Sequence, residues 1–281
     1  MKISDAASFF DTQPVSDAYT GEFLFNCQPD LYDSTTRDSV TGWRRSLVSE
    51  EVVVPTRGCI EFGSSYYLMG RLIEDFFQGS SIRVNAVIHP SDGLFSIGFA
   101  SDVLASETLV SMHAAHAIRK ETADSTESSQ LFNTMSIFVS ETEVPLRDQI
   151  LVGPDGGYFR VQNVISTTGG YLVLACSELG VEALQSVTYI AAGAYDPVTD
   201  VKSAATPILT TGIVERYQTN FRYVNQANAT YERGDKITTL LKSVVTTPKP
   251  DEELTVFGES YLIIQAIDDG AGCWEVHMRA A

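Results

Sequence analysis

Hydrophobic and polar positions alternate in short runs along most of the chain, and turn-forming residues separate the runs. Ile60-Glu61-Phe62 alternates apolar and polar residues, and a second run from Tyr66 to Met69 follows the glycine turn Gly63-Ser64-Ser65. A period of two is typical of a strand with one buried face, and a glycine turn between two such runs is typical of a β-hairpin. The pattern predicts a mainly β protein built from short antiparallel strands.

The hairpin pattern occurs three times along the sequence. Each copy consists of a proline, a polar stretch, a short β-type run, a glycine turn and an aromatic-led β run, over residues 55–70, 145–161 and 250–264. The aromatic-led runs place Tyr66, Tyr158 and Tyr261 at nearly equal spacing in the 281-residue chain. Such self-similarity indicates one structural unit used repeatedly.

Further predicted strands flank each hairpin. They precede it at residues 46–54, 136–139 and 237–245, and they follow it at residues 81–88, 170–176 and 273–278. The pattern in each third of the chain therefore predicts four to six antiparallel strands in a small barrel or sandwich. The expected modules are 1–92 with an extended N-terminal arm, 93–185 with a polar loop at 120–130, and 186–281.

Signals for helices are sparse. Residues 101–110 predict one short helix that residues 109–118 would continue, and residues 177–184 predict another turn or two. The polar segment 120–130 has no apolar period and predicts a long loop whose order depends on a neighbour. Residues 11–20 and 27–42 are rich in Ser, Thr, Asp and Tyr and predict extended segments of the same kind.

The composition narrows the possible classes of function. Hydrophobic residues make up 44% of the chain, which is too many for an intrinsically disordered protein. With 19 Lys and Arg against 36 Asp and Glu, the net charge of −17 argues against a nonspecific nucleic-acid binder. The N-terminus lacks the apolar region of a secretory signal, and the longest apolar runs are far shorter than the roughly 18–20 residues that span a bilayer.

The cysteines predict no metal site. Cys27, Cys59, Cys176 and Cys273 lie far apart and form no CxxC pair, whereas structural zinc sites use closely spaced ligand pairs. We expect reduced, mostly buried thiols, as is typical of proteins made in a reducing cytoplasm.

The standard catalytic and phosphate-binding motifs are absent. The sequence contains no G-x-S-x-G, no P-loop and no G-x-G-x-x-G motif, and the glycines of 153–157 predict a hairpin turn. His113 and His116 have helical spacing that would let them ligate a metal together with a third residue, but no HExxH pattern accompanies them, so structural roles are favoured. His89 and His277 lie in strand patterns. We therefore predict no catalytic, cofactor-binding or metal-binding residues, and no enzyme.

Acidic clusters and one cluster of tryptophan and arginine leave two other roles open, a facing pair of carboxylates and an anchor in a protein interface. The acidic groups Glu50-Glu51, Glu74-Asp75, Asp251-Glu252-Glu253 and Asp268-Asp269 lie near predicted turns, which is typical of solvated surface. Neighbours on a strand face opposite sides, so a facing pair of carboxylates would have to combine different modules. Trp43-Arg44-Arg45 predicts either a strand start with a packed Trp or an anchor in a protein interface.

One segment resembles a known family. Asp148-Gln149-Ile150, followed by residues 157–164, is similar to the core hairpin of small β-barrel proteins from tailed-bacteriophage virions, namely head-completion and head–tail joining proteins of the stopper type. Residues 42–70 resemble a second such module. The resemblance implies a ring-forming structural protein without an active site, although three modules in one chain depart from the single module usual in that family.

The resulting expectation is a non-enzymatic virion protein at the head–tail connection, or neck, of a tailed phage. Its expected partners are copies of itself in a ring and portal, adaptor, tail or capsid proteins, with assembly in the host cytoplasm and no binding to membranes or specific nucleic-acid sequences. An acidic surface would let DNA pass without sticking. The alternatives are a capsid decoration, cement or tail-surface protein, and a carbohydrate-active or carbohydrate-binding β-protein.

Overall fold

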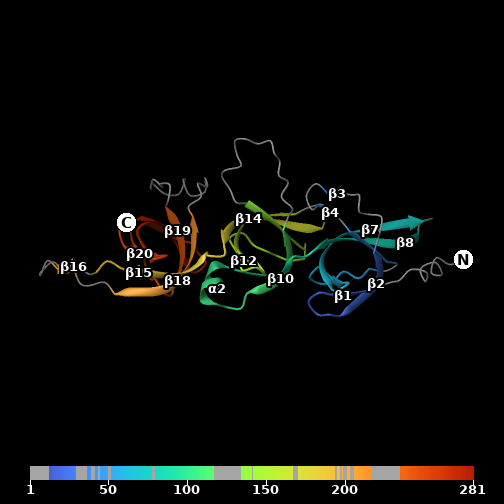
Figure 1. The fold of residues 1–281 in the computed structure, drawn as a ribbon, viewed down its shortest axis with the longest axis horizontal. Helices are drawn as coiled ribbons and strands as arrows, with labels where there is room; N and C mark the ends of the chain where they lie inside the picture. The colour runs from blue at the N-terminus through green and yellow to red at the C-terminus, as the bar shows by residue number, and fades with distance from the viewer. Residues whose placement is uncertain are drawn as a thin grey trace, which may run out of the picture.

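The fold consists of three closed β-barrels, which confirms the predicted mainly β class. The structure is a computed structural model and describes residues 13–29, 37–38, 42–43, 45–49, 52–77, 80–116, 134–140, 142–166, 170–193, 195–196, 198, 201–202, 206–216 and 235–281. The barrels follow one another in a row, with barrel two between barrel one and barrel three (Figure 1).

Each barrel contains six strands. Barrel one contains β1 (Gln13–Asp17), β2 (Phe23–Pro29), β5 (Arg45–Ser49), β6 (Cys59–Phe62), β7 (Ser65–Phe77) and β8 (Ser80–Pro90). Barrel two contains β9 (Gly93–Gly98), β10 (Val110–His116), β11 (Thr134–Ser140), β12 (Ile150–Val152), β13 (Tyr158–Ser166) and β14 (Tyr171–Gly180). Barrel three contains β15 (Leu184–Ile190), β18 (Pro207–Arg216), β19 (Lys236–Leu241), β20 (Glu253–Val256), β21 (Glu259–Asp268) and β22 (Cys273–Ala280).

Three small elements lie outside the barrel walls. The ribbon of β3 (Arg37–Asp38) and β4 (Gly42–Trp43) follows the second strand of barrel one, and the ribbon of β16 (Tyr195–Asp196) and β17 (Val201–Lys202) follows the first strand of barrel three. The helix α2 (Ala100–Ala105) connects the first two strands of barrel two. Its start is held by the backbone N–H of Phe99, which donates to the Asp102 carboxylate at 2.7 Å.

All three barrels have the same strand order. The first strand pairs with the second and the fourth, and the sixth pairs with the third and the fifth, as in β1-β2-β5-β8-β7-β6. Closure gives every wall strand two hydrogen-bonded neighbours, so no barrel presents a free sheet edge to solvent. The repeat predicted from sequence is therefore a repeat of topology.

The pairing register is also the same. In the hairpin of the fourth and fifth strands, an aliphatic residue faces an aromatic one: Ile60 faces Tyr67, Leu151 faces Phe159, and Leu254 faces Tyr261. An extra residue then follows Met69, Val161 and Ile263, and this β-bulge bends the fifth strand around the barrel.

The register corrects the predicted position of the repeated aromatic residue. Tyr67 and Phe159 are the buried counterparts of Tyr261, whereas Tyr66 and Tyr158 each lie one position earlier on the strand. Successive side chains on a strand point to opposite faces, so a shift of one residue moves the ring from the outer surface into the core.

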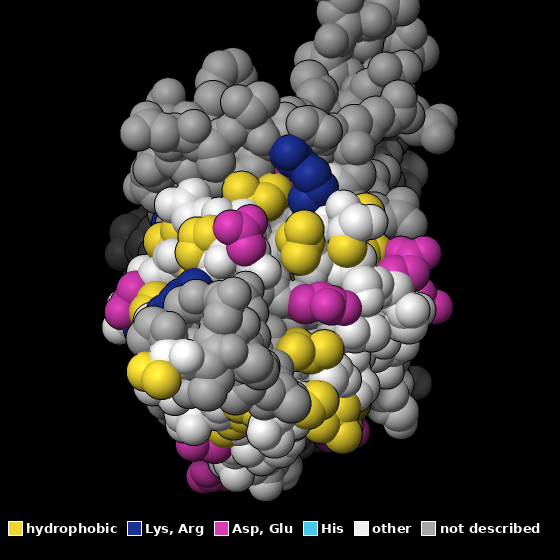
Figure 2. Space-filling view, turned by 90° about the vertical axis from the view of Figure 1, so that its left-hand side faces the viewer, with side chains coloured by type: hydrophobic (Ala, Val, Ile, Leu, Met, Phe, Trp, Pro, Cys, Tyr) yellow, Lys and Arg dark blue, Asp and Glu magenta, His cyan; other side chains and the backbone are white. Residues whose placement is uncertain are grey.

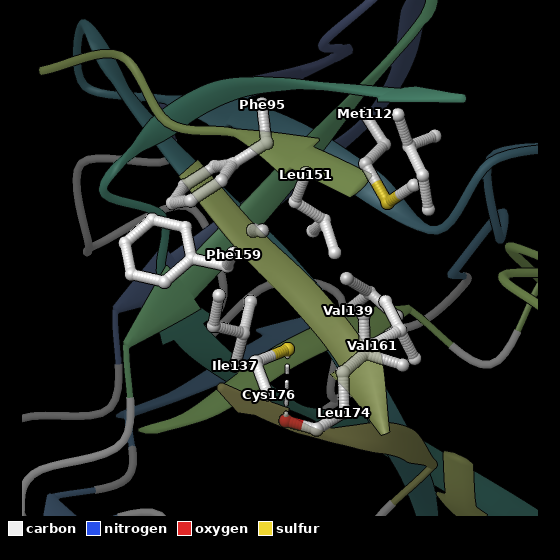
Figure 3. Packing of buried hydrophobic residues seen from close by; sticks show 11 residues of the cluster. Phe95, Met112, Ile137, Val139, Leu151, Phe159, Val161, Leu174 and Cys176 are labelled. Atoms are coloured by element: carbon white, nitrogen blue, oxygen red, sulfur yellow. Dashed lines mark hydrogen bonds between the residues drawn. The ribbon is translucent and has the colours of Figure 1, made fainter. Parts of the chain in front are cut away.

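Each barrel encloses its own apolar core. In barrel two, Phe95, Leu151, Phe159 and Val161 point toward one another from three strands (Figure 3). The equivalent positions of barrels one and three are also buried and belong to separate clusters. Interior packing of this kind stabilises each module by removing apolar surface from water.

The glycine turn predicted at residues 63–65 is a two-residue turn, and the corresponding hairpin of barrel three ends in a turn of the same length. Gly63 and Ser64 join β6 to β7, and Phe257 and Gly258 join β20 to β21; all four residues have positive φ. Turns of this handedness match the right-handed twist of the flanking strands. The glycines at 153–157 lie in the turn between β12 and β13, as predicted.

The predicted helices are largely wrong. Of the described residues predicted to be helical, only 101–105 lie in a helix; residues 110–116, expected to continue that helix, form β10, and residues 177–180 lie in β14. Both segments are paired with neighbouring strands, β10 with β9 and β11 and residues 177–180 with β13, and this pairing overrides their local preference. Of the segments expected to be extended, residues 13–17 and 27–29 lie in barrel strands, whereas the loop 120–130 lies outside the described residues.

The strands also locate the ends of the modules. The expected boundary after residue 92 falls in the short link between β8 and β9. The expected boundary after residue 185 falls inside β15, because that strand already begins at Leu184. The links between barrels are thus only a few residues long, which brings neighbouring barrels into direct contact.

Candidate functional site: the barrel junctions and the free end of barrel three

The first junction joins barrel one to barrel two through a buried apolar cluster. Cys59 and Leu68 on the outer surface of barrel one pack against Ala115, Tyr171 and Val173 on the outer surface of barrel two. The Tyr171 hydroxyl also donates to the backbone carbonyl of Leu68 at 3.5 Å. Burial of these outward-facing side chains stabilises the contact in the same way as a domain core.

Polar groups surround this cluster and are paired with one another. The Arg57 guanidinium of barrel one lies 2.8 Å from the Glu143 carboxylate of barrel two, and it donates to the carbonyl of Ser111 at 2.6 Å. The Tyr19 ring lies 4.0 Å under that guanidinium, and the Tyr19 hydroxyl accepts from the backbone N–H of His113 at 2.8 Å. The groups of both barrels thus satisfy one another across the junction.

Burial perturbs two titrating groups there. Desolvation raises the pKa of Tyr19, and the nearby Glu143 adds to the effect. Desolvation lowers the pKa of His113, and the positive charge of Arg57 lowers it further. The His113 ring also stacks on Tyr66 at a centroid distance of 4.7 Å, and its Nδ1 lies 3.2 Å from the Ser91 hydroxyl. His113 is therefore a neutral packing residue of the junction.

A glycine makes the closest approach between the two barrels. A Cβ added to Gly58 would lie 1.7 Å from the Ser140 Oγ and 2.7 Å from the Ser140 Cβ. Gly58 also has a φ of +59°, a conformation that side-chain-bearing residues rarely adopt. Glycine is thus required at this position for both packing and backbone reasons.

The second junction joins barrel two to barrel three. The helix α2 places Val103 and Leu104 against Ile213 and Cys273 of barrel three, and Ile150 completes the contact. The Arg160 guanidinium forms an ion pair with the Glu215 carboxylate, and both side chains are largely buried. Burial raises the pKa of the Cys273 thiol to about 12, so this thiol is an inert packing group.

The two junctions use equivalent positions. On the contributing barrel, the strand register aligns Cys59 with Ile150 and Leu68 with Arg160. On the receiving barrel, it aligns Ala115 with Ile213, Tyr171 with Cys273, and Val173 with Glu275. Barrel two therefore has one contributing face, on its fourth and fifth strands, and one receiving face, on its second, third and sixth strands; barrel one uses the contributing face and barrel three the receiving face.

Among the described residues, no further barrel packs against the corresponding fourth and fifth strands of barrel three. The position of barrel three equivalent to Leu68 and Arg160 is held by Leu262; the exposed fraction is 0% for Leu68, 8% for Arg160 and 41% for Leu262. Figure 2, which views the molecule from this end, shows hydrophobic side chains distributed among a few charged ones. We call the surface formed by Glu253, Ser260 and Leu262 the free face of barrel three.

Two hollows flank the second junction. The larger, of about 640 Å³, lies between the turn after β14 and the start of β21 and is lined by Glu178, Glu182, Lys236 and Phe257 among others. The smaller, of about 270 Å³, is lined by Asp148, Arg160, Asp268 and Glu275 among others. Within the described residues, no three His, Cys, Asp or Glu side chains are arranged to hold a metal ion.

The candidate histidine pair is separated by the strand geometry. His113 and His116 lie on β10, where residues three apart face opposite sides. His113 points into the first junction, whereas His116 lies 2.9 Å from the Asp92 carboxylate and contacts the rings of Phe95 and Phe159. The helical metal-ligand spacing read from the sequence is therefore wrong.

The other candidate groups are distributed over the three barrels. Cys27, Cys59, Cys176 and Cys273 are free and buried, as predicted. His89 and His277 lie in β8 and β22. Asp268 is exposed and paired with Lys242, whose ammonium lowers its pKa. Glu252, predicted to be solvated, is instead buried; it accepts from the Tyr189 hydroxyl at 2.5 Å and from the backbone N–H of Lys249 at 2.7 Å.

Sequence reasoning missed the residues that join the barrels, namely Tyr19, Arg57, Glu143, Arg160 and Glu215. The available signal was an arginine close to the repeated glycine or aromatic turn in the first two modules. Its meaning depends on partners more than 50 residues away in sequence, since Arg57 meets Glu143 and Arg160 meets Glu215. The side chains of Glu50-Glu51, Glu74-Asp75 and Trp43-Arg44-Arg45 lie outside the described residues.

Comparison with known proteins identifies no relative. No protein-family model, no curated protein and no solved structure matches this chain. Within the described residues no helix is long and apolar enough to cross a membrane.

Proposed function

We propose that this protein is a non-enzymatic structural component of a tailed-phage virion, located at the head–tail connection. In this role it joins the capsid vertex to the tail through protein–protein contacts and works as a member of a ring. The proposal starts from the resemblance of residues 42–70 and 148–164 to stopper-type barrel proteins, which have that role.

The repeated barrel junction is the observation that carries the proposal. The same fold contacts a copy of itself twice within the chain, through equivalent faces and with an Arg–Glu ion pair each time. A protein in which the contact between modules is the repeated geometry is suited to assembly. The polar groups of the first junction, including Glu143 and His113, are hydrogen-bonded to partners at that junction, as is typical of a packed contact between modules.

The charge supports the same role. A net charge of −17 generates a negative potential around the chain, which repels a DNA duplex and leaves it free to move past the protein. The same charge keeps unassembled chains soluble, so it is compatible with the alternative role of a capsid decoration or tail-surface protein.

The decisive experiment is localisation in the particle. Phage particles carrying a C-terminally tagged copy of this protein are labelled with an antibody and imaged by electron microscopy, and the copy number is measured by quantitative mass spectrometry against the major capsid protein. Label at the neck with one ring of copies is expected. Label spread over the shell in many copies would show a decoration protein, and absence from purified particles would refute a virion role.

A carbohydrate-directed function makes a different prediction. It requires carboxylates or exposed aromatic rings that converge on a ligand, and the hollow lined by Asp148, Asp268 and Glu275 gathers carboxylates from two barrels. Screening the purified protein on a glycan array and against chromogenic glycosides tests this alternative. Saturable glycan binding that is lost in Glu275→Gln would favour it over the structural role.

A further inference from the structure

We propose that the first junction is an acid-sensitive joint, in which protonation of the His113 imidazole separates barrel one from barrel two while both barrels stay folded. The inference goes beyond the proposed function, since it concerns the arrangement of the modules and not the place of the protein in a particle. Three features of the junction support it: the burial of one imidazole, the charges around that ring, and the short link between the two barrels.

Barrel one is what shields the His113 ring from water. His113 lies on β10 of barrel two and is only 3% exposed. Two rings of barrel one enclose its imidazole, since the centroid of the Tyr66 ring lies 4.7 Å away and that of the Tyr19 ring 5.2 Å away. Burial disfavours the charged form of an ionisable group. Protonation of His113 therefore opposes the closed junction and favours a state in which water reaches the ring.

The nearest positive charge adds to this effect. The Arg57 guanidinium lies 4.0 Å from the centroid of the same Tyr19 ring and donates to the carbonyl of Ser111, two residues before His113 on β10. A protonated imidazole would place a second positive charge beside Arg57 in a site from which water is excluded. Desolvation and, second, the charge of Arg57 accordingly lower the pKa of His113.

The carboxylates of the junction are engaged with other partners. Glu143 lies 2.8 Å from the Arg57 guanidinium and accepts from the Tyr19 hydroxyl at 3.3 Å. Within the described residues, no carboxylate forms an ion pair with the His113 imidazole, whose Nδ1 lies 3.2 Å from the uncharged Ser91 hydroxyl. The other titratable side chains around this part of the junction are Asp17, Cys59, His89, Asp92 and His116, of which Asp92 and His116 pair with each other at 2.9 Å.

The two barrels can separate without unfolding because each has a closed wall and its own core. Their buried clusters are distinct, and the link between them consists of Ser91 and Asp92, between β8 and β9. Since the Ser91 hydroxyl faces the His113 ring, the protonation site lies at the hinge itself. Local opening of this kind costs less than global unfolding, because the cores remain buried.

The second junction is not expected to respond in the same way. In barrel three the buried His277 ring lies 3.0 Å from the Glu275 carboxylate, so a proton on that ring is paired with a negative charge. The ion pair of Arg160 with Glu215 and the apolar cluster around Ile213 contain no histidine among the described residues. Acid therefore acts on the contact between barrels one and two.

The sign and the size of the effect follow from proton linkage. A hydrated imidazole has a pKa of 6.5 and the closed junction lowers it, so above pH 6.5 both states are unprotonated and the junction keeps its full stability. Below that pH the open state binds the proton more tightly, and each pH unit raises the open population by at most about tenfold, until the lowered pKa of the closed state is passed. Between pH 7.5 and pH 5.0 the upper limit is about thirtyfold.

The native cysteines report separately on the junctions and on the barrels. Cys59 is buried in the first junction and Cys273 in the second, whereas Cys27 and Cys176 lie in the cores of barrels one and two. The full-length chain is treated with dithiodipyridine at pH 7.5 and at pH 5.0, and peptide mass spectrometry measures the labelling rate of each cysteine. Division by the rate of the urea-unfolded chain at the same pH removes the intrinsic pH dependence of the reagent.

The normalised rate at Cys59 is expected to rise about tenfold from pH 7.5 to pH 5.0, while the other three cysteines stay protected. In His113→Gln and His113→Phe, neither of which can take up this proton, Cys59 should react equally at both pH values. His89→Gln and His116→Gln remove the neighbouring imidazoles and should keep the rise. Circular dichroism of each variant shows that the barrels are folded.

Three results would overturn the inference. The first is equal protection of Cys59 at both pH values. The second is a rise that Cys27 and Cys176 share, which would show that acid unfolds the barrels. The third is a rise that both His113 variants retain or that a control variant abolishes, which would assign the effect to another group. None of these results depends on where the protein lies in a particle, so this proposal and the proposed function fail separately.

Discussion

Replacing Gly58 by alanine tests the packing between barrels one and two. The added methyl group would have to occupy space already held by Ser140, whose Oγ and Cβ lie 1.7 Å and 2.7 Å from the ideal Cβ position. A left-handed conformation costs a residue with a Cβ about 1–2 kcal/mol. Overpacking in a filled site adds about 1–3 kcal/mol. We expect Gly58→Ala to lower the free energy of unfolding of the transition that includes barrel one by about 2–5 kcal/mol.

Gly21 provides the matched control. It has a φ of +71° and nothing lies within 4 Å of its ideal Cβ, so Gly21→Ala isolates the backbone cost of about 1–2 kcal/mol. Urea denaturation followed by circular dichroism and tyrosine fluorescence measures both variants. Adding Ser140→Gly should recover most of the excess loss in Gly58→Ala. Equal losses in Gly58→Ala and Gly21→Ala would refute the close contact between the barrels.

Three further outcomes are expected. The lowered pKa of His113 means that the unfolded chain binds the proton more tightly, so stability should fall as pH drops below about 6.5, and His113→Gln should reduce this slope in urea titrations at several pH values. Burial raises the pKa of all four cysteine thiols to about 12, so none should react with Ellman's reagent at pH 8 until the chain unfolds; rapid reaction in native buffer would contradict their burial. Glu215→Ala removes the carboxylate that the buried Arg160 meets across the second junction and should destabilise that junction by about 1.5–3 kcal/mol, whereas adding Arg160→Leu, which installs the residue that barrel one carries at this position, should restore part of the loss in the same denaturation assay.

The repeated junction also explains why the modules share register but not sequence. Interior positions need only an apolar side chain of suitable volume, so Ile60, Leu151 and Leu254 are interchangeable in type. Outward positions contact a different neighbour in each junction: Leu68 contacts Tyr171, whereas Arg160 pairs with Glu215. The two layers of the same strand are therefore under different physical constraints, and similarity between modules is concentrated on the inner layer.

Errors in the sequence-based prediction have the same origin. Residues 109–118 contain apolar and small residues that suit a helix, yet residues 110–116 form the second strand of barrel two because β9 and β11 pair with them on both sides. The aromatic repeat was placed one residue early at Tyr66 and Tyr158, because adjacent aromatic residues at both sites leave the inward position undetermined. A one-residue ambiguity along a strand changes which face is buried.

The sequence by itself determined the strand content, the turns and the threefold use of one unit, because period-two alternation and turn-forming residues act over a few neighbouring positions. Only the tertiary structure decided which outward-facing residues are buried. Leu68 and Leu262 are the same residue type at the same register position, and one is fully buried while the other is 41% exposed. The difference arises from whether another barrel lies against that face, and contacts between residues far apart in sequence leave no local pattern in the chain.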